Sequence, residues 1–169
     1  MVRRIADILI VLPWALPGTV VAIAMVESFS SFAGTVMLLP FLYFVRNIPI
    51  VVRAIDASFQ QMDPSLEEAA ISLGATAPYT IRRVVLPLVL PGVIAGSLLA
   101  FITALGEFVS SIMVYVYSNR PIAIEILSQL RQSNFGTASA YGVLLIVLIA
   151  VTLLIGERLR SPLKDPLVQ

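Results

Sequence analysis

The sequence predicts an all-α membrane protein with about four transmembrane helices and one polar loop between the second and third. Of its 169 residues, 59% are hydrophobic and 12% charged, against about 25% charged residues in an ordinary soluble domain. The charged residues leave uncharged runs that each approach or exceed the ~18–20 residues needed to cross a bilayer as a helix. These runs are 8–26, 28–45, 84–106 and 132–156. Lipid offers backbone groups no hydrogen-bond partner, so each run is expected to be helical.

We expect the four spans near residues 6–27, 31–51, 88–116 and 139–157, within a single domain. Basic residues beside membrane spans favour the cytoplasm. With four crossings, both termini and the loop 52–87 share a side, and most of the basic residues flank the spans on that side. They are Arg3, Arg4, Arg53, Arg82, Arg83, Arg158, Arg160 and Lys164, against only Arg120 and Arg131 opposite. The loop and both termini are therefore predicted to be cytoplasmic. The outer segment 118–138 is expected to hold a short helix at 121–130.

The first predicted span contains residues that interrupt helices. Pro13, Pro17 and Gly18 are expected to break it locally. Broken helices within a membrane are tolerated beside a pathway or when buried in protein. A simple packing kink is an equally good interpretation.

The third predicted span carries a stripe of small residues at every fourth position. Small residues let helices approach closely in lipid, although an apolar composition alone also produces such stripes. The predicted packing stripe is Gly92, Gly96, Ala100 and Ala104.

Two charges fall inside predicted spans. Arg46 is expected near the cytosolic end of the second span, where its side chain either reaches that surface or serves a function. Glu107 is expected about 30 Å along the third span from Pro87, in its outer half. The difference in depth argues against a direct Arg46–Glu107 pair. Buried charges are costly, so Glu107 is predicted to line a pathway or to secure an adjoining helix.

The polar loop contains a helix with defined ends. It begins either at Asp63, followed by Pro64, or at Ser65 with Glu68 reaching back as a capping box. Gly74 supplies the left-handed residue that stops it. The apolar positions between follow helical spacing and form a slim face. They are Leu66, Ala69, Ala70 and Leu73.

Composition also excludes several classes of function. There is no cysteine or histidine, so thiol and imidazole chemistry and the usual zinc ligands are missing. No nucleophile motif or phosphate-binding loop is present, and we expect neither an enzyme, nor a metal site, nor a resident cofactor. The net charge of +1 argues against a nucleic-acid partner.

The loop pattern Glu68-Ala69-Ala70-x3-Gly74-x9-Val84-x-Leu86-Pro87 resembles the EAA loop of permease subunits in ATP-binding cassette (ABC) importers. Val84 stands where the family often has isoleucine. Weaker matches follow the ferric-iron, polyamine or thiamine type from about residue 5 to 157. They are Leu12-Pro13-x3-Pro17-Gly18, Tyr43-x2-Arg46, Arg53, Ala100-Phe101-x5-Glu107-Phe108 and Asn134-x-Gly136. Family members usually have five or six core spans, so the chain is expected to be a C-terminal portion or a short subunit.

This resemblance implies the permease core of a type I importer in a bacterial inner membrane. The implied partners are a cytosolic ATPase dimer that binds ATP and magnesium, a second permease half or copy, an extracytoplasmic solute-binding protein and membrane lipid. The implied ATPase-docking residues are Glu67, Glu68, Ala69, Ala70, Leu73 and Gly74. The outer segment looks most like ferric-iron permeases, with polyamines, thiamine and phosphonates as alternatives. A non-transporting assembly partner, or an ATP-independent transporter or channel fragment, remain alternative functions.

Overall fold

The computed structural model describes residues 2–63 and 65–164, and every regular element in them is helical. The prediction of an all-α fold is confirmed. The elements are α1 (Val2–Ala15), α2 (Gly18–Ser28), the 3-10 turn η1 (Ser30–Phe32), α3 (Leu38–Gln60), α4 (Ser65–Ser72), α5 (Ala77–Thr80), the π-helical turn η2 (Ile81–Val85), α6 (Leu86–Leu105), α7 (Ser111–Val114), the 3-10 turn η3 (Tyr117–Asn119), α8 (Ile122–Arg131) and α9 (Phe135–Lys164).

Three helical stretches are long and apolar enough to cross a membrane. They are α3, the continuous helix Ala77–Leu105 made of α5, η2 and α6, and Phe135–Leu159 within α9. Helices α1 and α2 meet the same test only together, with a bend of 106° between them. The described residues therefore contain three candidate spans, or four if the bent pair is one broken span.

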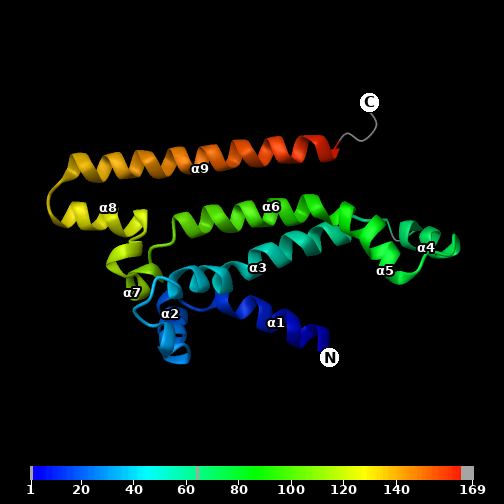
Figure 1. Ribbon diagram of the computed structural model, residues 1–169, viewed down its shortest axis with the longest axis horizontal. Coiled ribbons are helices and arrows are strands. Elements are labelled where there is room, and N and C mark those ends of the chain that lie inside the picture. The colour runs from blue at the N-terminus through cyan, green and yellow to red at the C-terminus, as the bar shows by residue number, and fades with distance from the viewer. Residues whose placement is uncertain (1, 64, 165–169) are drawn as a thin grey trace.

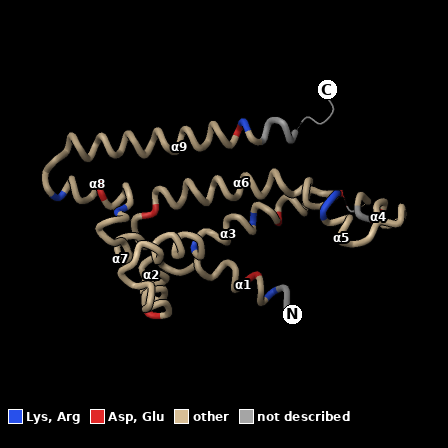
Figure 2. The backbone as a smooth tube through the Cα atoms, in the orientation of Figure 1, with Lys and Arg blue, Asp and Glu red and all other residues tan. Residues whose placement is uncertain are grey.

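The long helices lie alongside one another and define two ends of the molecule (Figure 1). The start of α1, the end of α3, α4, α5 and the end of α9 lie toward one end, which we call the loop end. Helices α2, α7 and α8 lie toward the opposite end, which we call the cap end. Charged residues are absent from long stretches of α6 and α9 (Figure 2). The loop and both ends of the described chain thus lie toward the same end of the bundle.

Helix α3 begins at Leu38 rather than near residue 31. The residues before it form η1 and a turn in which Gly34 has a φ of +75°, a left-handed conformation that interrupts a helix. Pro40 then lies in the first turn of α3, where its missing N–H removes no intrahelical bond. The helix continues to Gln60, so each of its residues sits closer to the cap end than predicted.

The other predicted boundaries also shift. Helix α6 ends at Leu105, well before residue 116, because the chain turns at Gly106 into a hydrogen-bonded loop. Helix α9 extends beyond the predicted 139–157 at both ends. Helix α8 matches the expected short outer helix within a residue, with Pro121 at its N-cap.

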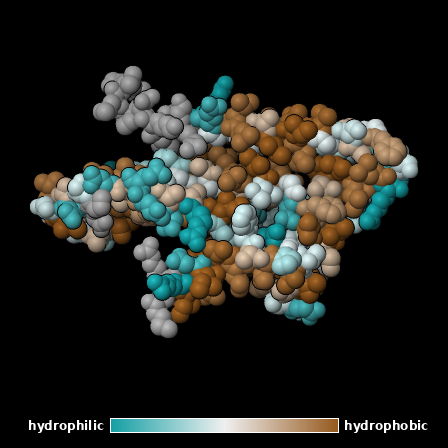
Figure 3. Space-filling model, turned by 180° about the vertical axis from the view of Figure 1, so that it is seen from behind, coloured by the Kyte–Doolittle hydropathy of each residue, from teal (hydrophilic) through white to brown (hydrophobic). Residues whose placement is uncertain are grey.

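Buried side chains gather at the cap end, where α2, α3 and α7 meet. This cluster consists of Val21, Ala22, Met25, Leu38, Leu39, Leu42 and Val114. Helix α9, by contrast, exposes large apolar side chains such as Ile146 (67%) and Leu154 (61%). Hydrophobic residues cover much of the upper and right-hand parts of the face shown in Figure 3. Soluble monomers rarely expose large contiguous apolar patches. The exposed apolar side chains of α9 therefore suit contact with lipid or with further helices.

Helices α3 and α6 approach closely because glycines of α6 face α3. A Cβ on Gly92 would lie 2.9 Å from the Ala54 carbonyl oxygen, and a Cβ on Gly96 would lie 3.0 Å from the Cα of Val51. These backbone atoms cannot turn aside as a flexible side chain can. The close contact of the two helices therefore depends on the absence of side chains at Gly92 and Gly96.

Gly96→Ala is expected to destabilise the protein by about 1–3 kcal/mol, because the new methyl group overlaps Ala54 and the backbone of α3. Gly142→Ala is the matched control, since nothing lies within 4 Å of its Cβ position on α9. The control should be neutral or more stable by about 1 kcal/mol, the helix preference of alanine over glycine. Thermal unfolding in detergent measures both changes. An unchanged Tm for Gly96→Ala would show that the close contact is dispensable.

Candidate functional site

The short helix α4 at the loop end is anchored at its start by an aspartate. Asp63 Oδ1 accepts the backbone N–H of Ser65 at 2.9 Å. That hydrogen bond, supplemented by the Ser65 side chain, holds the pKa of Asp63 below its usual value. The structure therefore favours Asp63 over Ser65 as the residue that caps α4.

The end of α4 is closed by a left-handed glycine. Gly74 has a φ of +83°, and its N–H donates to the Ile71 carbonyl at 2.9 Å. The next residue, Ala75, donates to the Ala70 carbonyl at 3.1 Å. This second bond spans five residues, as in the glycine-terminated C-cap of a helix. The structure therefore places a φ-positive glycine at the position where the sequence predicts the stop.

Helix α4 packs against α5 and η2 and leaves apolar side chains facing outward. Leu66 is 44%, Ile71 58% and Leu73 88% exposed. Glu68 and Ala69 are also exposed, and Ala70 is half-buried; the side chain of Glu67 lies outside the described residues. Helix α4 therefore presents an apolar surface that its own chain does not cover, as is typical of a protein interaction site.

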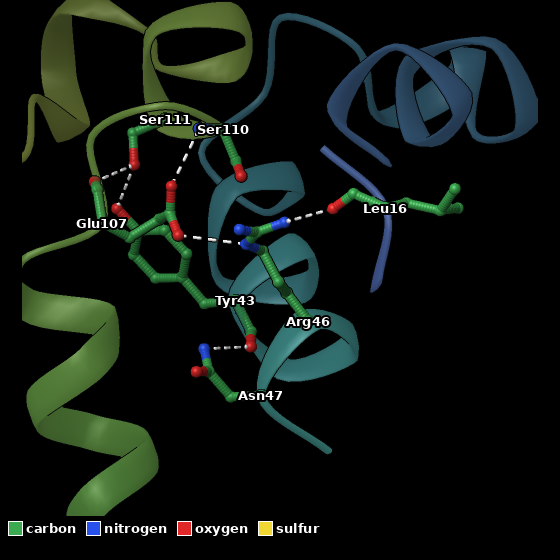
Figure 4. Close-up of polar contacts among 7 residues, drawn as sticks. All are labelled: Leu16, Tyr43, Arg46, Asn47, Glu107, Ser110 and Ser111. Carbon is green, nitrogen blue, oxygen red and sulfur yellow. Dashed lines mark hydrogen bonds and ion pairs between the residues drawn. The ribbon is translucent and has the colours of Figure 1, made fainter. Parts of the chain in front are cut away.

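A second polar site lies at the cap end, where α3 meets the loop after α6 (Figure 4). Arg46 Nε donates to Glu107 Oε2 at 3.0 Å, and the two side chains are only 17% and 12% exposed. The other carboxylate oxygen, Oε1, accepts the backbone N–H of Ser110 at 2.9 Å. Glu107 therefore bonds to α3 through one oxygen and organises its own loop through the other.

The expectation that Arg46 and Glu107 lie at different depths is wrong. Because α3 begins at Leu38, Arg46 is only about 12 Å of helical rise from the cap-end start of α3. Helix α6 ends at Leu105, which brings Glu107 to the same level. The Arg46 side chain therefore pairs with Glu107 and does not extend to the predicted cytosolic surface.

The same arginine lies beside the break between α1 and α2. Arg46 Nη1 is 3.5 Å from the Leu16 carbonyl oxygen, at the break itself. A Cβ on Gly18 would lie 3.2 Å from Arg46 Cζ and 2.5 Å from Ser110 Oγ. The sharp bend therefore packs directly against the ion pair. Pro13 lies within α1, and Pro17 is the N-cap of α2.

Hydrogen bonds extend this site along α3. Tyr43 OH and Ser111 Oγ lie 2.6 Å apart, and Asn47 Nδ2 donates to the Tyr43 carbonyl at 2.8 Å. Ser111 also donates to the Glu107 carbonyl. The contacts of Ser110 and Ser111 were not predicted from the sequence.

An apolar groove lies on the neighbouring face of α3 and α6. Its volume is about 460 Å³, and Ala100 and Ala104 of the predicted stripe line it with Phe44 and Phe101. Neither Arg46 nor Glu107 lines this groove. The ion pair therefore faces the α1–α2 bend, while Tyr43 and Asn47 connect the polar site to the groove.

A further ion pair organises the cap end. Arg120 Nη1 donates to Glu125 Oε2 at 2.8 Å, and its guanidinium lies 5.0 Å from the Tyr117 ring centroid. A hydrogen bond from Gln129, followed by that from Arg120, lowers the pKa of Glu125. Asn119 donates to the Val36 carbonyl at 3.1 Å and thereby joins this segment to the turn before α3.

The candidate spans and the exposed apolar surfaces together define a polytopic membrane protein with an exposed loop helix at one end. The family model for the "Binding-protein-dependent transport system inner membrane component" matches residues 1–164. The chain belongs to this family of membrane permease components, which confirms the resemblance drawn from its loop. A solved structure, "Inward facing conformations of the MetNI methionine ABC transporter: CY5 native crystal form", shares the fold with a TM-score of 0.82. It is 20% identical, over 96% of this chain and 76% of that chain.

The similar permeases are not all named for the same substrate. A probable ABC transporter permease protein, y4fN, of Sinorhizobium fredii is 33% identical over 90% of this chain and 29% of its own length. The ferric transport system permease protein FbpB of Actinobacillus pleuropneumoniae is 28% identical over 90% and 23%. The sulfate transport system permease protein CysT of Salmonella typhimurium is 30% identical over 90% and 60%. The chain therefore spans less than two thirds of each of these relatives.

Glu107→Gln is expected to destabilise the protein by about 3 kcal/mol, because it leaves the Arg46 charge without a partner in a poorly hydrated site. Arg46→Met should be similarly harmful. The double variant should cost less than the sum of the two by about 1–3 kcal/mol, as expected for side chains in direct contact. Thermal unfolding of the three variants in detergent measures this coupling. Strict additivity would mean that the pair contributes nothing as a pair.

Proposed function

We propose that this chain is the permease subunit, or part of one, of an ATP-driven, binding-protein-dependent importer. The observation that carries the proposal is α4, a capped helix whose apolar side chains project from the loop end. Its sequence has the pattern that docks on the ATPase in this family. Glu68, Ala69, Ala70, Leu73 and Gly74 form the docking surface, together with Glu67.

The path from this surface into the membrane is a single helix. After Gly74 the chain enters α5, η2 and α6, which continue without interruption from Ala77 to Leu105. Their 29 residues correspond to about 43 Å of helical rise. Glu107 follows at the far end and pairs with Arg46. We propose that closure of an ATPase dimer moves α4, and that this helix carries the movement to the cap end.

In this proposal, partner proteins supply the other components of the importer complex. ATP and magnesium bind to a separate cytosolic ATPase dimer, and no cofactor is assigned to this chain. A second permease half or a second copy completes the pathway, and an extracytoplasmic solute-binding protein delivers the substrate. The chain lies in a bacterial inner membrane with both termini and α4 in the cytoplasm, which the excess of arginine and lysine at the loop end supports.

Two substrates have specific support. Ferric iron is favoured by the resemblance of the outer segment 118–138 to ferric-iron permeases and by the similarity to the ferric permease FbpB. Sulfate is favoured by the relatives of the CysT type, of which this chain covers a larger share. Uptake of radiolabelled ferric iron and radiolabelled sulfate by cells that express the complete system separates the two. Uptake of neither would favour the polyamine, thiamine or phosphonate alternatives.

The first test is affinity purification of the tagged protein from membranes in mild detergent, with mass spectrometry of its partners. An ATPase among them supports the docking role, and a solute-binding protein identifies the substrate class. A second permease without transport activity would favour the assembly-partner function. A folded protein that never retains an ATPase, and whose flux needs no ATP, would favour the transporter or channel fragment and overturn the proposal.

Gly74→Val is expected to weaken ATPase retention and transport at least tenfold while leaving membrane insertion intact. A β-branched residue is strained at a φ of +83°, at a cost of about 1–2 kcal/mol or more. Gly74→Asn is the matched control, because asparagine tolerates this conformation. No atom lies within 4 Å of the Gly74 Cβ position, so size alone does not distinguish the variants. Equal loss in both would point to the added side chain blocking the partner instead of to helix termination.

A further inference from the structure

One face of the helix that leaves the loop is exposed, basic and aromatic. Tyr79, Arg82, Arg83 and Leu86 follow helical i, i+3, i+4, i+7 spacing, and all four are exposed. Tyr79 is 58% and Leu86 50% exposed. On the adjoining side of the helix Thr80 is buried at 2%. We call these four residues the η2 outer face.

The local helix geometry brings the two arginines together. Turn η2 is π-helical, and the Leu86 N–H donates to the Ile81 carbonyl five residues earlier. Pro87 follows and has no N–H to continue an α-helical ladder, which accounts for a wider turn at this place. More residues per turn means a smaller angle between neighbours, so Arg82 and Arg83 point in more similar directions than they would in an α-helix.

These two arginines differ from others in the protein. Arg46, Arg53 and Arg120 each lie within 4.0 Å of a carboxylate, whereas no carboxylate among the described side chains pairs with Arg82 or Arg83. Their position is also specific, because the chain from residue 84 to 106 carries no charge. The arginine pair therefore marks the level at which the apolar span begins, which is where lipid phosphates lie.

We propose that the η2 outer face binds the phosphate group of an anionic phospholipid in the leaflet at the loop end. Guanidinium groups bind phosphate oxygens through paired hydrogen bonds. An exposed tyrosine suits the headgroup level and an exposed leucine the acyl chains below it. The choice of the cytoplasmic leaflet rests on the proposed function, but the lipid chemistry does not.

The test measures lipid retention by the purified complex in nanodiscs of phosphatidylcholine mixed with phosphatidylglycerol. Native mass spectrometry counts both lipids on wild-type protein and on the double variant Arg82→Gln/Arg83→Gln. Each arginine near an anionic surface contributes a factor of about five, so the preference for phosphatidylglycerol should fall roughly 25-fold in the double variant. The double variant Arg82→Lys/Arg83→Lys keeps the charge but lacks the planar guanidinium groups that bind phosphate through paired hydrogen bonds. It should lose only part of the preference for phosphatidylglycerol.

Arg53→Gln/Arg158→Gln is the control, because it removes the same charge from exposed sites on α3 and α9. It should lose clearly less of the preference than Arg82→Gln/Arg83→Gln, because Arg53 is already paired with Asp56. An equal loss in this control would overturn the proposal in favour of a diffuse effect of charge. Unchanged lipid preference in Arg82→Gln/Arg83→Gln also overturns it, and loss of the ATPase alone would assign the face to that protein. Failure of wild-type protein to retain an ATPase bears on the proposed function and leaves the lipid measurement valid.

Discussion

Within a bilayer, every interrupted helix leaves backbone groups that water cannot satisfy. The bend between α1 and α2 is such an interruption, and it packs against the Arg46–Glu107 pair. The arginine lies beside the Leu16 carbonyl, while the glutamate also accepts the Ser110 N–H that organises the turn after α6. The Arg46–Glu107 pair thus contacts both the bend between α1 and α2 and the turn that follows α6. The cap-end cluster of α2, α3 and α7 is built around this junction.

The rest of the bundle has little core of its own, and its shape follows from close backbone contact. Helices α3 and α6 touch through Gly92 and Gly96, where a side chain would force them apart. Helix α9 presents apolar side chains outward over most of its length. In lipid the hydrophobic effect does not drive helices together, so packing of this kind and a few polar bonds determine their arrangement.

Composition and spacing were enough to predict the helical class and the ends of the loop helix, because uncharged runs and capping residues act locally. The family came from the resemblance of the loop sequence to a known motif. The register of the second span was not predictable in the same way. Its start depends on the left-handed turn at Gly34 and on Pro40 in the first helical turn. That error placed Arg46 too deep toward the loop end and hid its pairing with Glu107. The glycine pattern of α6 was visible in the sequence, but its partner on α3 depends on that same register.

Helix α4 is the element least able to stabilise itself. It has eight residues, and isolated helices this short are marginal in water. Asp63 and Gly74 fix its two ends, which lowers the entropy that a partner must remove when it binds. Its own chain covers its apolar side chains only in part, so their further burial is available to the proposed partner. A capped helix that precedes a continuous 29-residue helix and is only partly covered by its own chain therefore suits the proposed docking role.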